Sequence, residues 1–142
     1  DVGKTYVSAA LIRAARRAGM KVRALKPVVS GFDETDWAES DPGRLLAALG
    51  EAPTPEALGA MSPWRYVAPQ SPPLAARLQG QEIVLTDVAA WCRARMAEPG
   101  ADLTVLEGVG GLMSPSSPAK APRTTPPSRP PSRRWRRAAA CR

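Results

Sequence analysis

Gly3, Lys4 and Thr5 stand immediately before a stretch with helical apolar spacing. The pattern G-x-x-x-x-G-K-[ST] places backbone N–H groups around phosphates at the start of a helix. Its lysine reaches the β- and γ-phosphates and its hydroxyl binds Mg²⁺, and these roles would fall to Lys4 and Thr5. The first glycine of the pattern would lie three residues before Asp1. An ordinary helix N-terminus with a solvated lysine is the alternative that this motif alone leaves open.

Two more polar groups follow predicted strands. Lys26 and Ser30 lie in Lys-Pro-Val-Val-Ser-Gly, at the end of a strand predicted over 21–29. Glu107 follows a buried strand predicted over 102–106 and begins the turn Glu-Gly-Val-Gly-Gly. Because ligands of α/β sheets bind beyond the carboxyl ends of strands, these side chains should reach the rim that carries the phosphate loop. A carboxylate there is typical of a metal position, and the glycines allow close backbone approach. A solvated lysine and a plain acidic turn remain the alternatives.

Asp41 precedes Pro42 at the start of a predicted helix. Aspartate is a favoured N-cap, because its side chain accepts hydrogen bonds from the first backbone N–H groups of a helix. Capping alone would therefore explain this residue. A second metal-binding carboxylate is the other interpretation.

The elements that would position these residues alternate between helix and strand. A helix over 5–18 has apolar residues at 7, 10, 11, 14, 15 and 18, and Gly19 is its expected C-cap. We further expect a loop over 30–40, a helix over 42–49 that ends at Gly50, a long loop over 53–84 with a short helix near 55–61, and a helix over 85–97 with Thr86 as N-cap. This order predicts an α/β domain with a mostly parallel sheet covered by helices on both faces.

The formal charge of +7 comes entirely from the last part of the chain. Residues 1–114 hold 12 Lys/Arg and 13 Asp/Glu, whereas residues 115–142 hold 8 Lys/Arg and no acid. The first 114 residues therefore give no electrostatic reason to expect nucleic acid or an acidic membrane as partner.

Residues 115–142 form a segment of different composition, with 7 Pro, 7 Arg and 5 Ala. Such a segment cannot bury enough apolar surface to offset its ordering entropy, so we expect a disordered tail beyond a partial domain over 1–114. A natural basic arm is one interpretation. A wrong-frame translation of a GC-rich gene is the other, and the abrupt end of the motif at 107–115 favours it.

The two cysteines do not suggest a disulfide framework, and Cys92 in a helical stretch reads as a small apolar filler. No apolar run approaches the roughly 20 residues of a membrane span, and the chain opens on a motif rather than a secretory signal. The expected compartment is the cytoplasm.

The series Asp-Val-Gly-Lys-Thr, Lys-Pro-Val-Val-Ser-Gly, Ser-Asp-Pro and Glu-Gly-Val-Gly-Gly resembles dethiobiotin synthetase in order and spacing. The proline-rich stretch over 62–72 is also similar to the middle loop of that family. The resemblance covers about residues 1–115. It implies a P-loop NTPase-like fold that is incomplete here, with the first strand and the C-terminal half missing.

The resemblance also implies an activity and a site. The family is an ATP-dependent cyclo-ligase of biotin biosynthesis, which closes the ureido ring of dethiobiotin from 7,8-diaminopelargonate, CO₂ or bicarbonate and ATP, with Mg²⁺, as a homodimer. By resemblance, Lys26 and Lys4 are catalytic and Ser30 contacts the substrate. Thr5, Asp41 and Glu107 match the Mg²⁺ positions. The residues that would contact the nucleotide are Asp1, Val2, Gly3, Lys4, Thr5, Tyr6, Asp41, Glu107, Gly108, Val109 and Gly110.

Two alternatives stay open at the level of sequence. One is another P-loop enzyme, such as a cobyrinate amidase-type ligase or a partitioning ATPase, which would share the phosphate loop but not Lys-Pro-Val-Val-Ser-Gly. The other is a nucleic-acid-binding protein that acts through the basic tail. Because the family's C-terminal half is replaced by the tail, we expect the activity of this polypeptide to be impaired.

Overall fold

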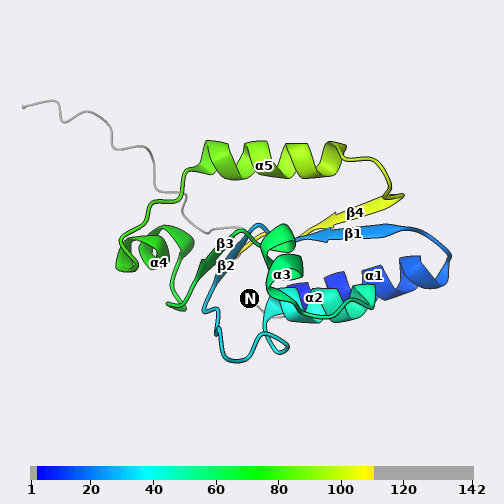
Figure 1. Ribbon diagram of the computed structural model, residues 1–142, viewed down its shortest axis with the longest axis horizontal. Coiled ribbons are helices and arrows are strands. Elements are labelled where there is room, and N and C mark those ends of the chain that lie inside the picture. The colour runs from blue at the N-terminus through cyan, green and yellow to red at the C-terminus, as the bar shows by residue number, and fades with distance from the viewer. Residues whose placement is uncertain (1–2, 111–142) are drawn as a thin grey trace, which may run out of the picture.

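The computed structural model describes residues 3–110 of the chain. Within that range five helices and four short strands alternate along the chain (Figure 1). The helices are α1 (Lys4–Arg17), α2 (Asp41–Leu49), α3 (Pro55–Met61), α4 (Pro72–Leu78) and α5 (Leu85–Ala97). The strands are β1 (Val22–Leu25), β2 (Val28–Ser30), β3 (Trp64–Tyr66) and β4 (Leu103–Leu106).

All strand pairs in the described residues are parallel, and helices lie on both sides of them. β1 pairs with β4, with Val22 opposite Leu103, and β2 pairs with β3, with Val28 opposite Trp64. Figure 1 shows α1 and α2 on one side of β1 and β4, and α5 on the other. The predicted fold class, an α/β domain with parallel strands and helices on both faces, is therefore confirmed.

The single strand predicted over 21–29 is wrong, because the chain changes partner at Pro27. Up to Leu25 it pairs with β4, and from Val28 it pairs with β3. Pro27 has no backbone N–H to donate to a ladder, so a continuous strand is interrupted there. The backbone on either side of this break is held by other bonds, from the Lys26 N–H to the Met61 carbonyl at 3.1 Å and from the Trp64 N–H to the Pro27 carbonyl at 3.1 Å.

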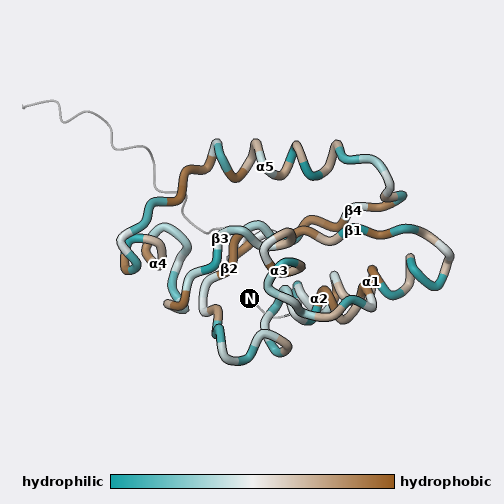
Figure 2. The backbone as a smooth tube through the Cα atoms, in the orientation of Figure 1, coloured by the Kyte–Doolittle hydropathy of each residue, from teal (hydrophilic) through white to brown (hydrophobic). Residues whose placement is uncertain are grey.

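The main core lies between α1, α2, α3 and the strands. Ile12, Leu45, Leu46, Leu58 and Met61 are buried in it. Figure 2 shows that β2 and β4 are among the most hydrophobic stretches, as expected for strands enclosed between helices. A second cluster forms around β3, α4 and α5; its buried members are Val28, Tyr66, Ala75, Ala76 and Val88, and Cys92 packs against it. Cys92 is free and half-buried, in keeping with a small apolar filler.

The face on which α1 packs differs from the predicted one. Ala9, Ile12 and Ala15 are its buried residues, whereas Val7 is 65% exposed and Leu11 is 49% exposed. The helix is apolar on two sides, so periodicity alone could not decide which side meets α2. The side with small alanines lets α2 approach closely, and the side with Val7 and Leu11 is left in solvent within the described part of the chain.

The predicted long loop over 53–84 contains two elements that the sequence analysis missed. β3 has only three residues, too few to show a period of two. α4 begins at Pro72, a favoured first helical residue because its missing N–H would have no partner there. The short helix near 55–61 is confirmed as α3.

The structure excludes capping as the explanation of Asp41, and the predicted cap of α5 and the predicted burial of β4 are wrong. Ser40, not Asp41, caps α2, and its Oγ accepts a hydrogen bond from the Gly43 N–H at 3.2 Å. The N-cap of α5 is Val84, so Thr86 lies inside the first turn and caps nothing. β4 begins at Leu103 and is half-buried rather than buried, because the described chain pairs it only with β1. The predicted helix stop at Gly50 is confirmed, at a left-handed φ of 76°.

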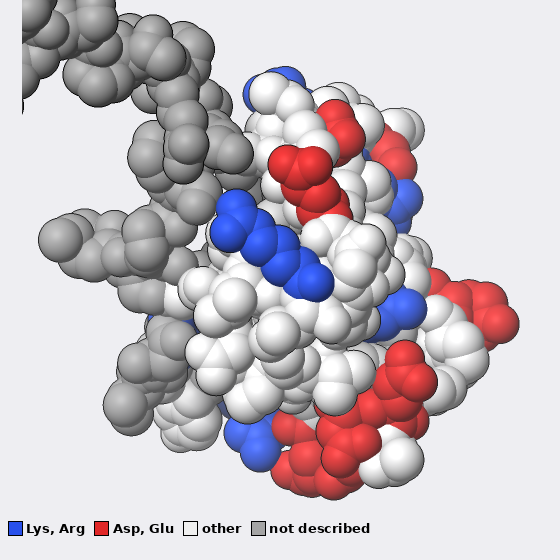
Figure 3. All heavy atoms as spheres, turned by 90° about the vertical axis from the view of Figure 1, so that its left-hand side faces the viewer, with Lys and Arg blue, Asp and Glu red and all other residues white. Residues whose placement is uncertain are grey.

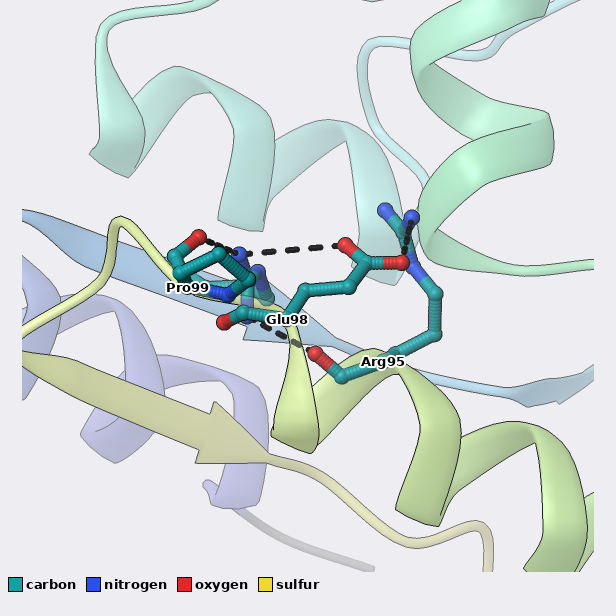
Figure 4. Close-up of polar contacts among 4 residues, drawn as sticks. Arg95, Glu98 and Pro99 are labelled. Carbon is teal, nitrogen blue, oxygen red and sulfur yellow. Dashed lines mark hydrogen bonds and ion pairs between the residues drawn. The ribbon is translucent and has the colours of Figure 1, made fainter.

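The C-terminus of α5 is tied to β1 by one arginine (Figure 4). Arg23 donates hydrogen bonds to the carbonyls of Arg95 at 2.7 Å, Glu98 at 2.9 Å and Pro99 at 3.1 Å. A helix C-terminus leaves such carbonyls without intrahelical partners, so Arg23 supplies the missing donors. This contact fixes the start of the connection to β4, which carries Glu107 at its far end.

Two further observations concern partners and membranes. On the face drawn in Figure 3, acidic and basic side chains are interspersed in small groups, with much uncharged surface around them. Among the described helices, none combines the length and apolar character that crossing a bilayer requires. The basic segment 115–142, including its predicted disorder, lies outside the described residues.

Candidate functional site

A cavity of about 290 Å³ opens where the N-termini of α1 and α2 meet the carboxyl ends of β1, β2 and β4. This is the rim at which α/β sheets bind their ligands. Every predicted site residue within the described range lines it. The lining residues are Gly3, Lys4, Thr5, Tyr6, Lys26, Val29, Ser30, Asp41, Arg44, Glu107, Gly108, Val109 and Gly110. Asp1 and Val2 lie outside the described residues.

The first wall of the cavity is the start of α1. Gly3 has a left-handed φ of 94°, which glycine adopts without strain, and its carbonyl accepts the first helical bond from Val7 N–H at 2.9 Å. Among the described residues, no side chain caps this helix and its first turn holds no acidic residue. The N–H groups of that turn and the positive end of the helix dipole therefore face a position that suits an anion.

The floor of the cavity is a buried lysine between two carboxylates. The Nζ of Lys26 lies 2.5 Å from Oε1 of Glu107 and 2.9 Å from Oδ2 of Asp41. Lys26 is 2% exposed and Glu107 is 4% exposed. The two residues meet because β1 and β4 are paired and both end here, with the Glu107 N–H donating to the Leu25 carbonyl at 2.8 Å. Burial of a charged group is costly unless it is paired, which this arrangement achieves.

Asp41 reaches the cavity because it is the first residue of α2 and not its cap. Ser40 performs the capping, so the Asp41 carboxylate can accept a hydrogen bond from Lys26 instead. Burial alone would raise the pKa of Asp41, but the hydrogen bond and charge of Lys26 hold that pKa below its ordinary value. Asp41 is therefore ionised at neutral pH.

The oxygen atoms of the site fit a small divalent cation. Thr5 Oγ1 donates to Glu107 Oε1 at 2.6 Å, so a hydroxyl and two carboxylates converge. The second oxygen of Glu107, Oε2, is buried without a hydrogen-bond partner among the described residues. The described chain has no group of three or more His, Cys, Asp or Glu that could hold a metal alone. Mg²⁺ is commonly held by one or two carboxylates together with water and substrate phosphates, so two carboxylates and a hydroxyl suffice for it.

Two lining residues were missed by the sequence analysis. Val29 lies in β2 beside Ser30, and Arg44 lies one helical turn after Asp41 on α2. The spacing of three residues from Asp41 was a usable signal for Arg44, because residues three apart share a helix face. Arg44 forms an exposed ion pair with Glu39 at 3.0 Å.

Comparison with known proteins places this site in a family. The model of a family described as an AAA domain matches residues 1–121. ATP-dependent dethiobiotin synthetase of Methylobacterium nodulans is 51% identical over 119 residues, which cover 81% of this chain and 53% of that protein. The synthetase of Caulobacter sp. strain K31 is 52% identical over 81% of this chain and 49% of its own length. That of Acidiphilium cryptum is 41% identical over 81% of this chain and 52% of its own.

The chain spans about half the length of the curated relatives it matches. The resemblance to dethiobiotin synthetase that the motifs indicated is confirmed by these relatives. Since the family match extends over residues 1–121, and the structure shows parallel strands, helices on both faces and a Gly-Lys-Thr turn at the start of α1, the chain belongs to the AAA domain family.

Proposed function

We propose that this chain provides the phosphate-binding and metal-binding part of an ATP-dependent dethiobiotin synthetase. The reaction joins 7,8-diaminopelargonate, CO₂ and ATP to give dethiobiotin, ADP and phosphate in biotin biosynthesis. One observation carries the proposal: Lys26, Asp41, Glu107 and Thr5 contact one another in a cavity beside the start of α1. The relatives of 41–52% identity carry the name of this enzyme, and they support the same conclusion.

The proposed reaction needs positive charge beside the transferred phosphoryl group. A carbamate formed from one amine and CO₂ is a poor electrophile until its oxygen takes the γ-phosphoryl group of ATP. The second amine then attacks the carbamoyl carbon, phosphate leaves, and the ring closes. Negative charge develops on the transferred phosphoryl group, and preorganised donors stabilise it far better than water does.

Different residues of this chain would perform the separate tasks of this reaction. The N–H groups at the start of α1 and the ammonium of Lys4 hold the phosphates. Lys26 stabilises the phosphorylated carbamate, and Ser30 orients the diamine at the end of β2. When bound, Mg²⁺ supplies neutralisation of the β- and γ-phosphates, and Thr5, Asp41 and Glu107 are the residues that would hold it. The unpartnered Oε2 of Glu107 supports this assignment.

From the resemblance we also propose that the complete enzyme is a homodimer and makes the substrate contacts of the family. The alternatives are less well supported. No relative named here is a cobyrinate amidase or a partitioning ATPase, and the described residues form no basic surface on the face drawn in Figure 3.

A chimera tests the proposal. Residues 1–110 replace the matching stretch of the Methylobacterium nodulans relative, and ADP release and dethiobiotin formation are measured with and without the diamine. We expect ADP release that depends on the diamine and on CO₂, with one dethiobiotin formed per ADP. A folded chimera that hydrolyses ATP equally well without the diamine would contradict the proposal and favour another P-loop ATPase.

A further inference from the structure

The buried ammonium of Lys26 holds both of the carboxylates that the proposed function assigns to the metal. Its Nζ lies 2.5 Å from Glu107 and 2.9 Å from Asp41. The Lys26 and Glu107 side chains are each 3% exposed, so water does little to screen their contact. One positive charge therefore sits between two negative charges and leaves the group with a net charge of −1.

The hydroxyl of Thr5 is engaged at the same place. It donates its proton to Oε1 of Glu107, the oxygen that also accepts from Lys26. A cation bound to Thr5, Asp41 and Glu107 would share the two carboxylates with the ammonium, even where it uses the unpartnered Oε2 of Glu107. It would also stand in contact with that ammonium, and two positive charges at such a distance repel strongly in a partly buried site. The ammonium of Lys26 and a divalent cation therefore compete for these two carboxylates.

Arg44, the arginine among the described lining residues, does not have this relation to the carboxylates. Arg44 pairs with Glu39, and its side chain is 58% exposed. Its charge contributes to lowering the pKa of Asp41, but less than the contacts of Lys26 do. Lys26 is therefore the side chain that competes with a cation for Asp41 and Glu107.

We propose that Lys26 takes the place of the divalent cation in the ligand-free protein, and that entry of the cation releases the Lys26 ammonium into the cavity. This inference rests on the proposed function, which assigns the metal to the same oxygens. The exchange keeps a positive charge between the two carboxylates in both states. It also makes the free site a weak binder of metal, so the cation enters together with the negative charge of a triphosphate.

Binding of Mn²⁺ to the 142-residue chain, measured by electron paramagnetic resonance with and without ATP, tests the exchange. The variants are Lys26→Met, which removes the competing charge, and Lys26→Arg, which keeps it. Lys21→Met is the matched control, because Lys21 is an exposed lysine at the start of β1. We expect Lys26→Met to bind Mn²⁺ at least about tenfold more tightly than the unmodified chain, and the other two variants to stay near it.

The outcomes separate this inference from the proposed function. Unchanged or weaker Mn²⁺ affinity in Lys26→Met, with clear binding to the unmodified chain, would overturn the exchange and leave the metal site intact. Absence of Mn²⁺ binding from every protein, even with ATP, would overturn the metal site and the exchange with it.

A second measurement uses the unmodified chain, so its result does not depend on whether the Lys26 variants fold. Lysine acylation, followed by peptide mass spectrometry, reports how accessible each ammonium is. We expect the labelling rate of Lys26 to rise at saturating Mg²⁺, while that of Lys21 stays constant. A Lys26 rate that stays constant or falls would show that the ammonium remains between the carboxylates, and would overturn the exchange.

Discussion

At the scale of single residues, the site is an arrangement of opposite charges beside the proposed phosphate position. Lys26 is neutralised by Asp41 and Glu107, whereas Lys4 stands at the start of α1 beside the same cavity. These two lysines therefore have different work. In the proposed function, Lys26 serves the carboxylates and the reacting group, and Lys4 serves the phosphates.

Lys4→Ala in the chimera tests the phosphate role. Removing a preorganised donor to a developing charge typically lowers kcat by about 10²-fold or more, and we expect a loss of that size in ADP release. Lys4 lies at a helix N-terminus, so the circular dichroism spectrum should not change. Turnover equal to that of the unchanged chimera would remove Lys4 from the phosphate site.

The pKa of Tyr66 gives a prediction about pH. Burial raises this pKa above its ordinary value of 10.0, and Oη has no hydrogen-bond partner among the described residues. The folded protein holds this proton more tightly than the unfolded chain does, so the contribution to stability is present below pH 10 and is lost as pH rises beyond it.

Tyr66→Phe should remove that alkaline loss. At pH 7 the variant should be as stable as the unmodified protein or more stable by about 1 kcal/mol, since an unsatisfied buried hydroxyl is costly. Urea unfolding at pH 7 and pH 10.5 measures both effects. An equal fall in unfolding free energy for both proteins between these pH values would argue against the role of Tyr66.

At the scale of elements, two adjacent residues at the start of α2 have different roles. One caps the helix, and the other is the proposed metal ligand. Ser40 accepts the hydrogen bond from Gly43, and Asp41 faces Lys26. The sequence Ser-Asp-Pro offered two good caps, and the residue types alone could not say which one acts. The structure decides because the helix begins at Asp41.

Ser40→Ala and Asp41→Asn form a matched pair that tests this division. Loss of the cap should lower the free energy of unfolding by about 1 kcal/mol and leave Mn²⁺ binding with ATP unchanged. Asp41→Asn should abolish most Mn²⁺ binding while the cap of α2 stays in place. The reverse pattern in unfolding and electron paramagnetic resonance measurements would return Asp41 to capping.

Much of the site could be predicted from sequence because its residues belong to local motifs at strand ends and helix starts. Lys4, Lys26 and Glu107 each follow from the element beside them. Parallel pairing of β1 with β4 brings the last two together without further information. The missed parts depend on contacts between distant segments. β3 is a strand only because β2 lies beside it, and the packing face of α1 depends on where α2 sits.

At the scale of the whole molecule, the described chain leaves apolar surface in solvent. Val7 and Leu11 lie one turn apart on α1 and are both exposed, and Leu106 at the end of β4 is 45% exposed. Neighbouring exposed apolar side chains such as Val7 and Leu11 can mark a contact site or a tendency to aggregate. Relatives about twice as long as this chain have further polypeptide to place against such a surface.

Leu11→Glu tests whether this face is an internal surface of the longer enzyme. In the 142-residue chain we expect less aggregation, seen by light scattering, because the change only adds charge to solvent-exposed helix. In the chimera the same change should lower the free energy of unfolding by about 2 kcal/mol or more, since the glutamate would be buried. Leu85→Glu on α5 is the control for an exposed leucine elsewhere. Equal effects of the two changes in the chimera would show that the α1 face stays exposed.

Pro27 has an effect on Lys26 that begins before the chain folds. A residue that precedes proline is sterically excluded from the helical region of backbone conformation, so Lys26 is biased toward the extended form even in the denatured ensemble. Lys26 therefore loses less backbone entropy than its neighbours when its side chain meets the two carboxylates. Pro27→Ala would keep the side-chain contacts of Lys26, yet should lower stability by about 0.4–1 kcal/mol with Mn²⁺ affinity unchanged. Pro27, which divides β1 from β2, therefore also acts in the unfolded protein, because it favours there the extended backbone conformation that the buried Lys26 requires.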